Sequence, residues 1–168
     1  MRTRSFARSS IFVGLLFSQL ALASDTIPNC PAYALKQQNG GDPGSLGLNN
    51  QQVIEWKRTT QNQFLARANV KGQVVRVYPD RNGHEHFAIA LGHSPGETLE
   101  VIYNQAFGAV GVIKEGMMVE ACGDYITSTA VSPGPGGKTY PASPDGAIIH
   151  WIHFAPARSG HHSGYMMV

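Results

Sequence analysis

The chain has 168 residues, of which 42% are hydrophobic and 14% charged, and this length suits one ordinary domain. Of its 13 Lys and Arg residues, three (Arg2, Arg4 and Arg8) lie before residue 24, where the sequence has no acidic residue. The rest of the chain has ten basic residues against 11 acidic ones, a formal charge of −1, and no basic cluster. This balance argues against avid, sequence-independent binding of nucleic acids.

The first 23 residues have the pattern of a secretory signal peptide. The three arginines precede an apolar run, Ile11–Leu22, and Ala21-Leu22-Ala23 forms a small-x-small cleavage site. The apolar run is shorter than the about 20 residues that a membrane-spanning helix needs, and no later segment approaches that length. We therefore expect cleavage after Ala23 and a periplasmic or secreted protein without a transmembrane segment.

Residues 24–50 are predicted to be an irregular N-terminal segment. Three prolines and the run Gln37–Gly41 are typical of turns and loops. From residue 51 to residue 168 we predict a single domain, made of one helix followed by β-strands. The helix is expected over residues 51–68, after an approximate capping box between Asn49 and Gln52, with its apolar stripe facing the sheet.

The sequence has two cysteines, Cys30 and Cys122. In a strand over residues 117–126, Cys122 would share the polar face with Glu120 and Asp124, which is an unusual place for a free thiol. Disulfides form and persist in the oxidising compartments that exported proteins enter. We therefore expect a Cys30–Cys122 disulfide that ties the N-terminal segment to the domain.

Short runs rich in Val, Ile and Tyr, separated by Gly, Pro, Asp and Asn, occupy most of the chain after the helix. The predicted strands are residues 70–78, 86–91, 98–104, 117–126 and 147–154. Five successive strands favour a small antiparallel barrel, and the OB-like barrel is the best-known five-stranded version. A β-sandwich or a β-roll packed on the helix is the alternative. The Pro- and Gly-rich residues 131–145 would form a long loop between the last two strands.

Histidine is the chemically most informative residue type, because four of the seven histidines lie within residues 145–165. In a strand over residues 147–154, His150 would point to the more apolar face, while Trp151 and His153 would not share one face with it except across a bulge. On an apolar face, a neutral histidine that is hydrogen-bonded to a neighbour is the usual outcome. We therefore expect His150 to be an inner support and His153 to belong to a site.

A second pair, His84 and His86, has the i, i+2 spacing that puts two imidazoles on one face of a strand. Two imidazoles can supply part of a Zn²⁺ or Cu²⁺ site, which usually has about three or four ligands. We predict that His86, His153 and His161 approach one another, so a divalent metal such as zinc is the candidate cofactor. The sequence lacks nucleophile, P-loop and dinucleotide-binding motifs.

The element I-H-W-x-H, which begins at Ile149, is followed by H-x-x-G-aromatic, which begins at His161. With the Gly, Asn and Tyr positions of the preceding strands, this pattern resembles a family of small exported bacterial proteins known as domain of unknown function 3465. The resemblance covers about residues 70–166 and implies no activity. This chain has Tyr103 where the family tends to have His before Asn104. The candidate ligand-binding residues are His86, Tyr103, Asn104, Trp151, His153 and His161.

Two functions from different classes follow from these patterns. The first is an exported OB-like binding module that holds an unknown ligand at a histidine-rich surface. The alternative is a metal-dependent hydrolase, for example a nuclease, in which His86, His153 and His161 surround an ion that activates water. A structural or envelope-assembly role is the third reading. We expect a monomer, and the metal content of the purified chain would discriminate between the first two readings.

Overall fold

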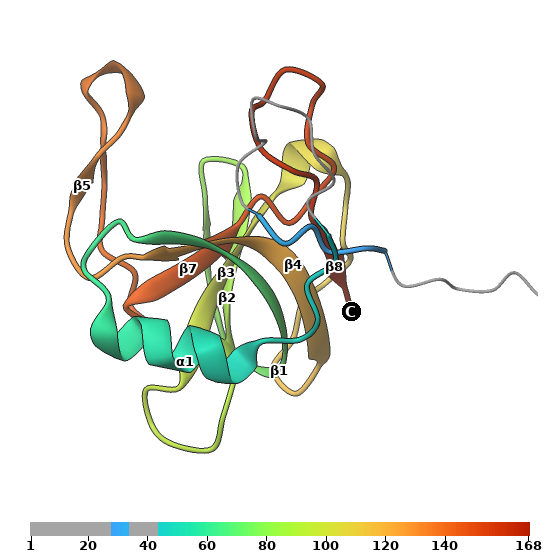
Figure 1. Cartoon of the computed structure of the whole chain (residues 1–168), viewed down its shortest axis with the longest axis vertical. Coiled ribbons are helices and arrows are strands. Elements are labelled where there is room, and N and C mark those ends of the chain that lie inside the picture. The colour runs from blue at the N-terminus through green and yellow to red at the C-terminus, as the bar shows by residue number, and fades with distance from the viewer. Residues whose placement is uncertain (1–27, 34–43) are drawn as a thin grey trace, which may run out of the picture.

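The structure is a computed structural model that describes residues 28–33 and 44–168. The predicted signal peptide and much of the predicted irregular segment lie outside the described residues. The elements are α1 (Asn50–Thr59), β1 (Leu65–Arg81), β2 (His84–Ala90), β3 (Thr98–Asn104), η1 (Gln105–Phe107), β4 (Met118–Thr127), β5 (Ser132–Pro133), η2 (Pro135–Gly137), β6 (Thr139–Tyr140), β7 (Ala147–His150) and β8 (Tyr165–Met167). The protein is therefore mainly β with one α-helix, as the sequence predicts (Figure 1).

Five strands form a ring-like sheet in the order β1-β2-β3-β7-β4, and pairing of β1 with β4 joins its two ends. All of these pairs are antiparallel except β3 with β7, where Val101 lies opposite Ile149 in a parallel register. The prediction of a wholly antiparallel sheet is wrong at this pair, because the chain crosses over from β4 before it enters β7. The second edge of β4 is shared, first by β8 and then by β7.

Strand β1 is long enough to pair with β4 through its first half and with β2 through its second half. The change of partner occurs at residues 72–73, where Gln73 lies opposite both Met118 and Ala90. A Cβ atom on Gly72 would lie 2.1 Å from the carbonyl oxygen of Ala90. A glycine is therefore needed for the two backbones to approach so closely.

The helix is shorter than predicted, because residues 65–68 belong to β1 and pair with β4. Thr60 has an extended conformation and ends the helix, and Gln63 has a φ of 69° in the turn that follows. The predicted capping box is also absent, since the Asn49 side chain does not cap the helix. Its Oδ1 instead accepts a hydrogen bond from the backbone N–H of Asn69 at 2.9 Å. Tertiary pairing with the sheet thus overrides the local helical pattern.

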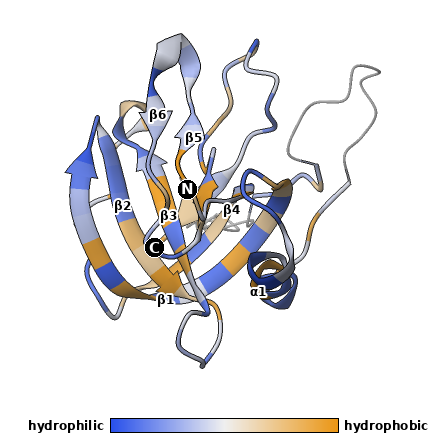
Figure 2. Ribbon diagram, turned by 90° about the vertical axis from the view of Figure 1, so that its left-hand side faces the viewer, coloured by the Kyte–Doolittle hydropathy of each residue, from blue (hydrophilic) through white to orange (hydrophobic). Residues whose placement is uncertain are grey.

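The hydrophobic core fills the inside of the ring, and hydrophobic residues alternate with polar ones along β1 (Figure 2). Val53 and Ile54 of α1 join this core, and Trp56 packs on Phe64 and Tyr125 with ring centroids 5.8 and 5.3 Å apart. Trp56 and Phe64 are thus packing residues. In the described part of the chain, no helix is long and apolar enough to span a membrane.

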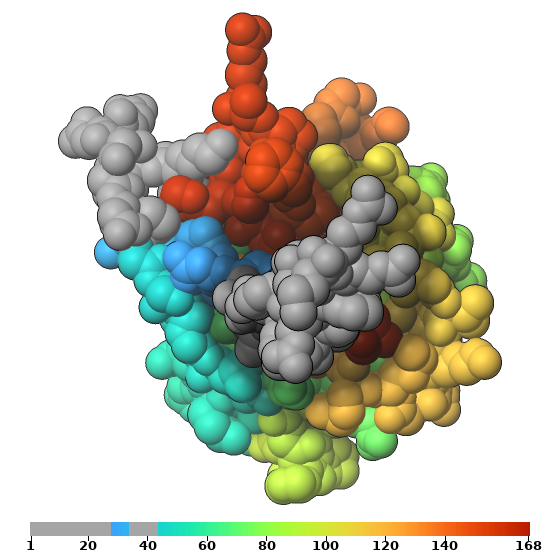
Figure 3. All heavy atoms as spheres, turned by 90° about the vertical axis from the view of Figure 1, so that its right-hand side faces the viewer, coloured from blue at the N-terminus to red at the C-terminus, as the bar shows by residue number. Residues whose placement is uncertain are grey.

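The predicted disulfide is confirmed, with Cys30 and Cys122 bonded and their Cα atoms 5.7 Å apart. The backbone N–H of Leu46 also donates to the carbonyl of Cys30 at 2.7 Å, and Pro31 pairs with Ser45. These contacts hold residues 28–33 against the sheet, beside the C-terminal residues drawn in red (Figure 3). The predicted loop over residues 131–145 contains the short β5–β6 hairpin, which projects from the sheet (Figure 1).

Candidate functional site

The candidate site lies on the face of the sheet that points away from the core. Arg67 on β1 lies opposite Asp124 on β4, and Asp124 lies opposite His150 on β7. Continuing the parallel register of β7 with β3 brings Ile102 beside His150, and Ile102 lies opposite His86 on β2. Because residues that pair across strands share a face, these five residues form one row across the ring, hereafter the cross-strand row.

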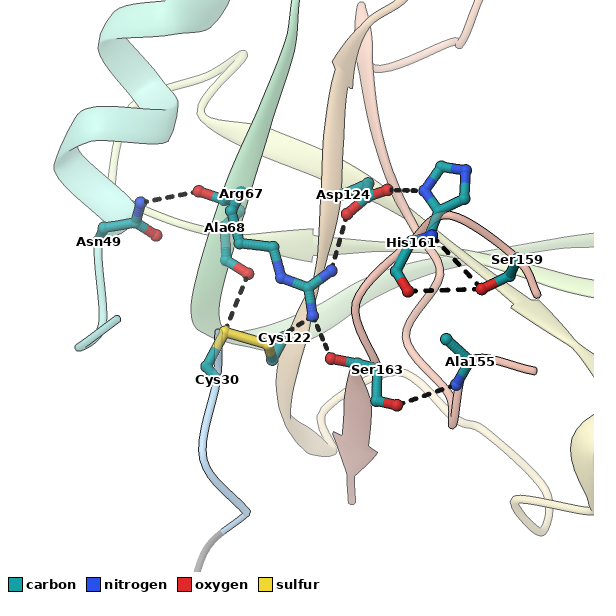
Figure 4. Close-up of polar contacts among 10 residues, drawn as sticks. All are labelled: Cys30, Asn49, Arg67, Ala68, Cys122, Asp124, Ala155, Ser159, His161 and Ser163. Atoms are coloured by element: carbon teal, nitrogen blue, oxygen red, sulfur yellow. Dashed lines mark hydrogen bonds and ion pairs between the residues drawn. A yellow bond between two sulfur atoms is a disulfide. The ribbon is translucent and has the colours of Figure 1, made fainter. Parts of the chain in front are cut away.

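Arg67 and Asp124 form an ion pair whose side chains are both fully buried, with Nη1 of Arg67 2.7 Å from Oδ1 of Asp124 (Figure 4). Nη2 of Arg67 also donates to the carbonyl of Ser163 and contacts Sγ of Cys122. Burial lowers the pKa of Arg67 and raises the pKa of Asp124, and each partner opposes the shift of the other. The pair therefore ties the disulfide and the C-terminal segment to β1 and β4.

His161 is the third member of this network. Its Nδ1 lies 2.6 Å from Oδ2 of Asp124, and its side chain is 24% exposed. Its ring stacks on the indole of Trp151 with centroids 4.2 Å apart and planes 10° apart. A buried carboxylate that holds Nδ1 of a histidine keeps a proton on that nitrogen and fixes the orientation of the ring. Figure 4 shows the far edge of the imidazole directed away from Asp124.

The backbone of residues 151–164 is built to hold these rings. The predicted strand over residues 147–154 is wrong beyond His150, because Trp151 has a φ of 55° and ends β7. Positive φ is unusual for a bulky residue and is often found at functional sites. The segment then returns to the edge of β4 through Gly164, whose N–H donates to the carbonyl of His153 at 2.8 Å.

His153 lies in this segment and is 6% exposed. Its ring stacks on Phe107 with centroids 3.6 Å apart, and Trp151 lies 5.2 Å from it. Burial lowers the pKa of His153, while its hydrogen bond to the carbonyl of Phe154 opposes that shift. Phe107 is held in η1, where Oδ1 of Asn104 accepts the N–H of Ala106 at 3.0 Å. Asn104 thus acts on the site through the turn that it caps.

The other end of the row is formed by His86, and His84 lies beside it on the same face of β2. Nδ1 of His86 lies 2.8 Å from the buried carboxylate of Glu100, and Nδ1 of His84 lies 3.0 Å from the carbonyl of Asn82. An oxygen without a proton must accept, so both histidines carry a proton on Nδ1. With His153 and His161, four histidines share this arrangement.

His150 lies between the two ends of the site. Its ring centroid is 5.6 Å from that of His84 and 5.9 Å from that of Trp151. Burial lowers its pKa to about 4, with smaller contributions from the four neighbouring histidines, so the ring is neutral at pH 7. Its Nε2 is buried and has no hydrogen-bond partner in the described structure. His150 thus lies on the outer face of the sheet and not, as predicted, on the more apolar one, and its Nε2 lacks the expected hydrogen bond.

The structure brings three of the predicted ligand-binding residues into contact: Trp151 lies between His153 and His161. His86 lies farther along, beyond His84 and His150 in the series of ring contacts. Tyr103 is 7% exposed and packs in the hydrophobic core on the other face of β3. Within residues 28–33 and 44–168, no group of three or more His, Cys, Asp or Glu side chains is arranged to hold a metal ion.

Three polar residues that organise this site could not be assigned from the sequence: Arg67, Glu100 and Asp124. Asp124 was one of several candidate aspartates, and nothing in the sequence selected it. Arg67 was assigned to the predicted helix, so its pairing with Asp124 was hidden. Both carboxylates alternate with core residues in strand-like runs, and that alternation was a usable signal. A scan against protein-family models finds no match to the sequence, and a search of curated proteins finds no similar chain. The function is therefore argued from the site itself.

Proposed function

We propose that this chain is an exported, OB-like binding module that holds its ligand on the outer face of the sheet, around Trp151, His153 and His161. Support for an OB-like barrel comes from the strand order, in which β7 returns between β3 and β4 and the two ends of the sheet pair. Support for export comes from the signal-like N-terminus and from the Cys30–Cys122 disulfide, which suits a periplasmic or secreted protein.

The observation that carries the proposal is the double ring stack. Phe107 stacks on His153, Trp151 stacks on His161, and the two pairs meet through the 5.2 Å contact of Trp151 with His153. The stack combines apolar ring faces with two imidazoles that are held in place by hydrogen bonds at Nδ1. Phe107 is 41% exposed, so the stack reaches the molecular surface.

The chemistry of the stack favours an uncharged ligand that carries several hydroxyl groups. Hydroxyls both donate and accept hydrogen bonds, so they can pair with imidazole nitrogens in either protonation state, and aromatic ring faces pack on the apolar faces of sugars. The cation of the site, Arg67, is fully buried in its pair with Asp124 and is not offered to an anion. Oligosaccharides are one of the two ligand classes that OB folds bind, so we propose this class.

Tryptophan fluorescence tests the proposal directly. A Trp56→Phe variant leaves Trp151 as the single tryptophan, since the sequence has two. Titration with a panel of soluble oligosaccharides should change its emission, and His161→Ala should abolish the response. His93→Ala is the matched control, because His93 is an exposed histidine in the β2–β3 connection. If no oligosaccharide changes the emission, or if His93→Ala abolishes it equally, the proposal fails.

A second candidate function is supported by the 2.6 Å contact of His161 with Asp124. A histidine oriented by a buried carboxylate is the arrangement of a general base, which would make the protein a hydrolase. The predicted metal-dependent version needs His86, which lies at the other end of the row. A hydrolase should cleave a bis(p-nitrophenyl) phosphate or p-nitrophenyl ester probe, and Asp124→Asn and His161→Asn should both remove that activity. Activity that persists in His161→Asn would contradict it.

A further inference from the structure

We propose that His84 and His150 form a two-histidine site for a borderline transition-metal cation, Cu²⁺ above all. This site lies on the side of His150 that is away from the Trp151–His161 stack, and it uses neither His153 nor His161. It therefore does not depend on the proposed ligand or on the predicted metal trio.

His150 carries a ring nitrogen without a partner. Its Nε2 is buried and lacks a hydrogen-bond partner within the described part of the chain. A buried polar atom without a partner costs free energy, and such an atom in a native structure calls for an explanation such as an ion. The same ring is neutral at pH 7, and neutral imidazole is the form that binds metals.

His84 is oriented in the way that metal-binding histidines usually are. Its Nδ1–H is tied to the carbonyl of Asn82 at 3.0 Å, which leaves the Nε2 lone pair on the other edge of the ring. Metal-binding histidines almost always donate their second ring N–H in this way, because the hydrogen bond fixes tautomer and orientation. The side chain lies at the start of β2, where it is partly exposed and can admit an ion from solvent.

The separation of the two rings suits a shared ion. An imidazole nitrogen binds zinc or copper at about 2.0–2.1 Å, so two ring centroids that share one ion lie roughly 5–6 Å apart. The centroids of His84 and His150 are 5.6 Å apart. The ring centroid of His86 lies 6.4 Å from that of His84, outside this range. Water or an incoming ligand would complete the coordination, since two protein ligands leave positions open.

The choice of Cu²⁺ follows from the ligand type. Imidazole suits copper, nickel and zinc, and affinity for a given nitrogen site is highest for Cu²⁺. Neither ligand is a thiolate, because both cysteines are used in the disulfide. The site should therefore bind Cu²⁺ more tightly than Zn²⁺. It should not bind Mg²⁺ or Ca²⁺, which prefer oxygen ligands.

The test is titration of the untagged, disulfide-intact chain with Cu²⁺ alone, buffered by glycine. We expect one bound ion per chain, quenching of Trp151 next to His150, and coupling to two nitrogen nuclei in the electron paramagnetic resonance spectrum. His84→Ala should weaken binding by at least the roughly tenfold that even outer-shell changes cost at metal sites. His93→Ala and His161→Ala should bind as the parent does.

The outcomes separate cleanly. Loss of binding in His84→Ala with a native circular dichroism spectrum supports the site, and His150→Asn should repeat the loss. Unchanged binding in His84→Ala would overturn the proposal, as would loss in His161→Ala alone, because the ion would then sit at the Trp151–His161 stack. Failure of oligosaccharide binding would leave this result untouched, since the metal probe does not involve that ligand.

Discussion

Replacing Arg67 by Met tests whether the buried ion pair organises the site. The substitution removes the cation that contacts Asp124 at 2.7 Å and leaves the carboxylate 0% exposed, with His161 as its remaining side-chain partner. At an effective dielectric constant of about 20, charges roughly 4 Å apart attract by about 4 kcal/mol. Removal of one partner of a buried pair costs about 3–5 kcal/mol, because the other charge stays buried. We expect the free energy of unfolding of Arg67→Met to fall by about 3–5 kcal/mol.

Urea denaturation of the disulfide-intact chain, monitored by fluorescence, measures this loss. The slope of the unfolding free energy against urea concentration should stay the same as in the parent. The matched control is the double variant Arg67→Met, Asp124→Leu, which removes both charges. Replacing a whole buried pair by apolar residues is often close to neutral, so the double variant should be more stable than Arg67→Met alone. A loss below about 1 kcal/mol in Arg67→Met, or a double variant that is less stable still, would refute the reasoning.

Three further predictions concern the surroundings of this pair. Replacing Cys30 and Cys122 by Ser should lower the free energy of unfolding by about 2–4 kcal/mol, measured in urea. Burial and the bond to Glu120 raise the pKa of Tyr165 to about 12, so the stability it contributes below pH 10 should be lost as pH rises toward 12. Ultraviolet absorbance of tyrosinate, measured against pH, should show one tyrosine that ionises at a higher pH than the others. This step should be missing in Tyr165→Phe. Gly164→Ala should destabilise the fold by about 1–3 kcal/mol through overpacking, because the new Cβ would lie 2.2 Å from the carbonyl oxygens of Cys122 and Trp151.

Each of these has an outcome that contradicts it. Equal stability of the cysteine variant and the oxidised parent would mean that the N-terminal tether adds nothing. A parent protein whose tyrosines all titrate near pH 10 would remove the special environment of Tyr165. Gly47→Ala is the control for Gly164→Ala, since a Cβ at Gly47 meets no atom within 4 Å. A loss as large in Gly47→Ala as in Gly164→Ala would contradict the close-approach argument.

The strands were predictable wherever short-range alternation and turn residues agree. Residues 98–104 match β3 to the residue, because polar and core positions alternate and glycine-containing turns bound the run. Residues 65–68 were assigned to the helix, since no local signal distinguishes them, and only pairing with β4 makes them a strand. The parallel contact of β3 with β7 depends on a crossover that spans more than 40 residues. Sequence patterns of period two or 3.6 carry no information on that distance.

Within the candidate site, proximity in sequence was the useful signal. Trp151 and His153 are two residues apart, and a turn brings His161 back to them, so their contact could be anticipated. The partner of His161 is 37 residues away on β4. Asp124 could be found only through the register of β1 with β4, and that register was hidden once Arg67 had been placed in a helix.

The sharing of one edge of β4 by β7 and β8 has a consequence for how such a surface can diversify. The connection of residues 151–164 leaves that edge after His150 and returns to it at Tyr165, so both of its ends are fixed by backbone pairing. Lengthening a loop whose ends are already held costs little, about 0.6 kcal/mol for each doubling. Its tip, residues 156–160, can therefore vary in length and composition while the ring and the disulfide stay as they are. The sheet and the disulfide can thus stay the same while the loop changes, as in other proteins that carry recognition loops on a rigid scaffold.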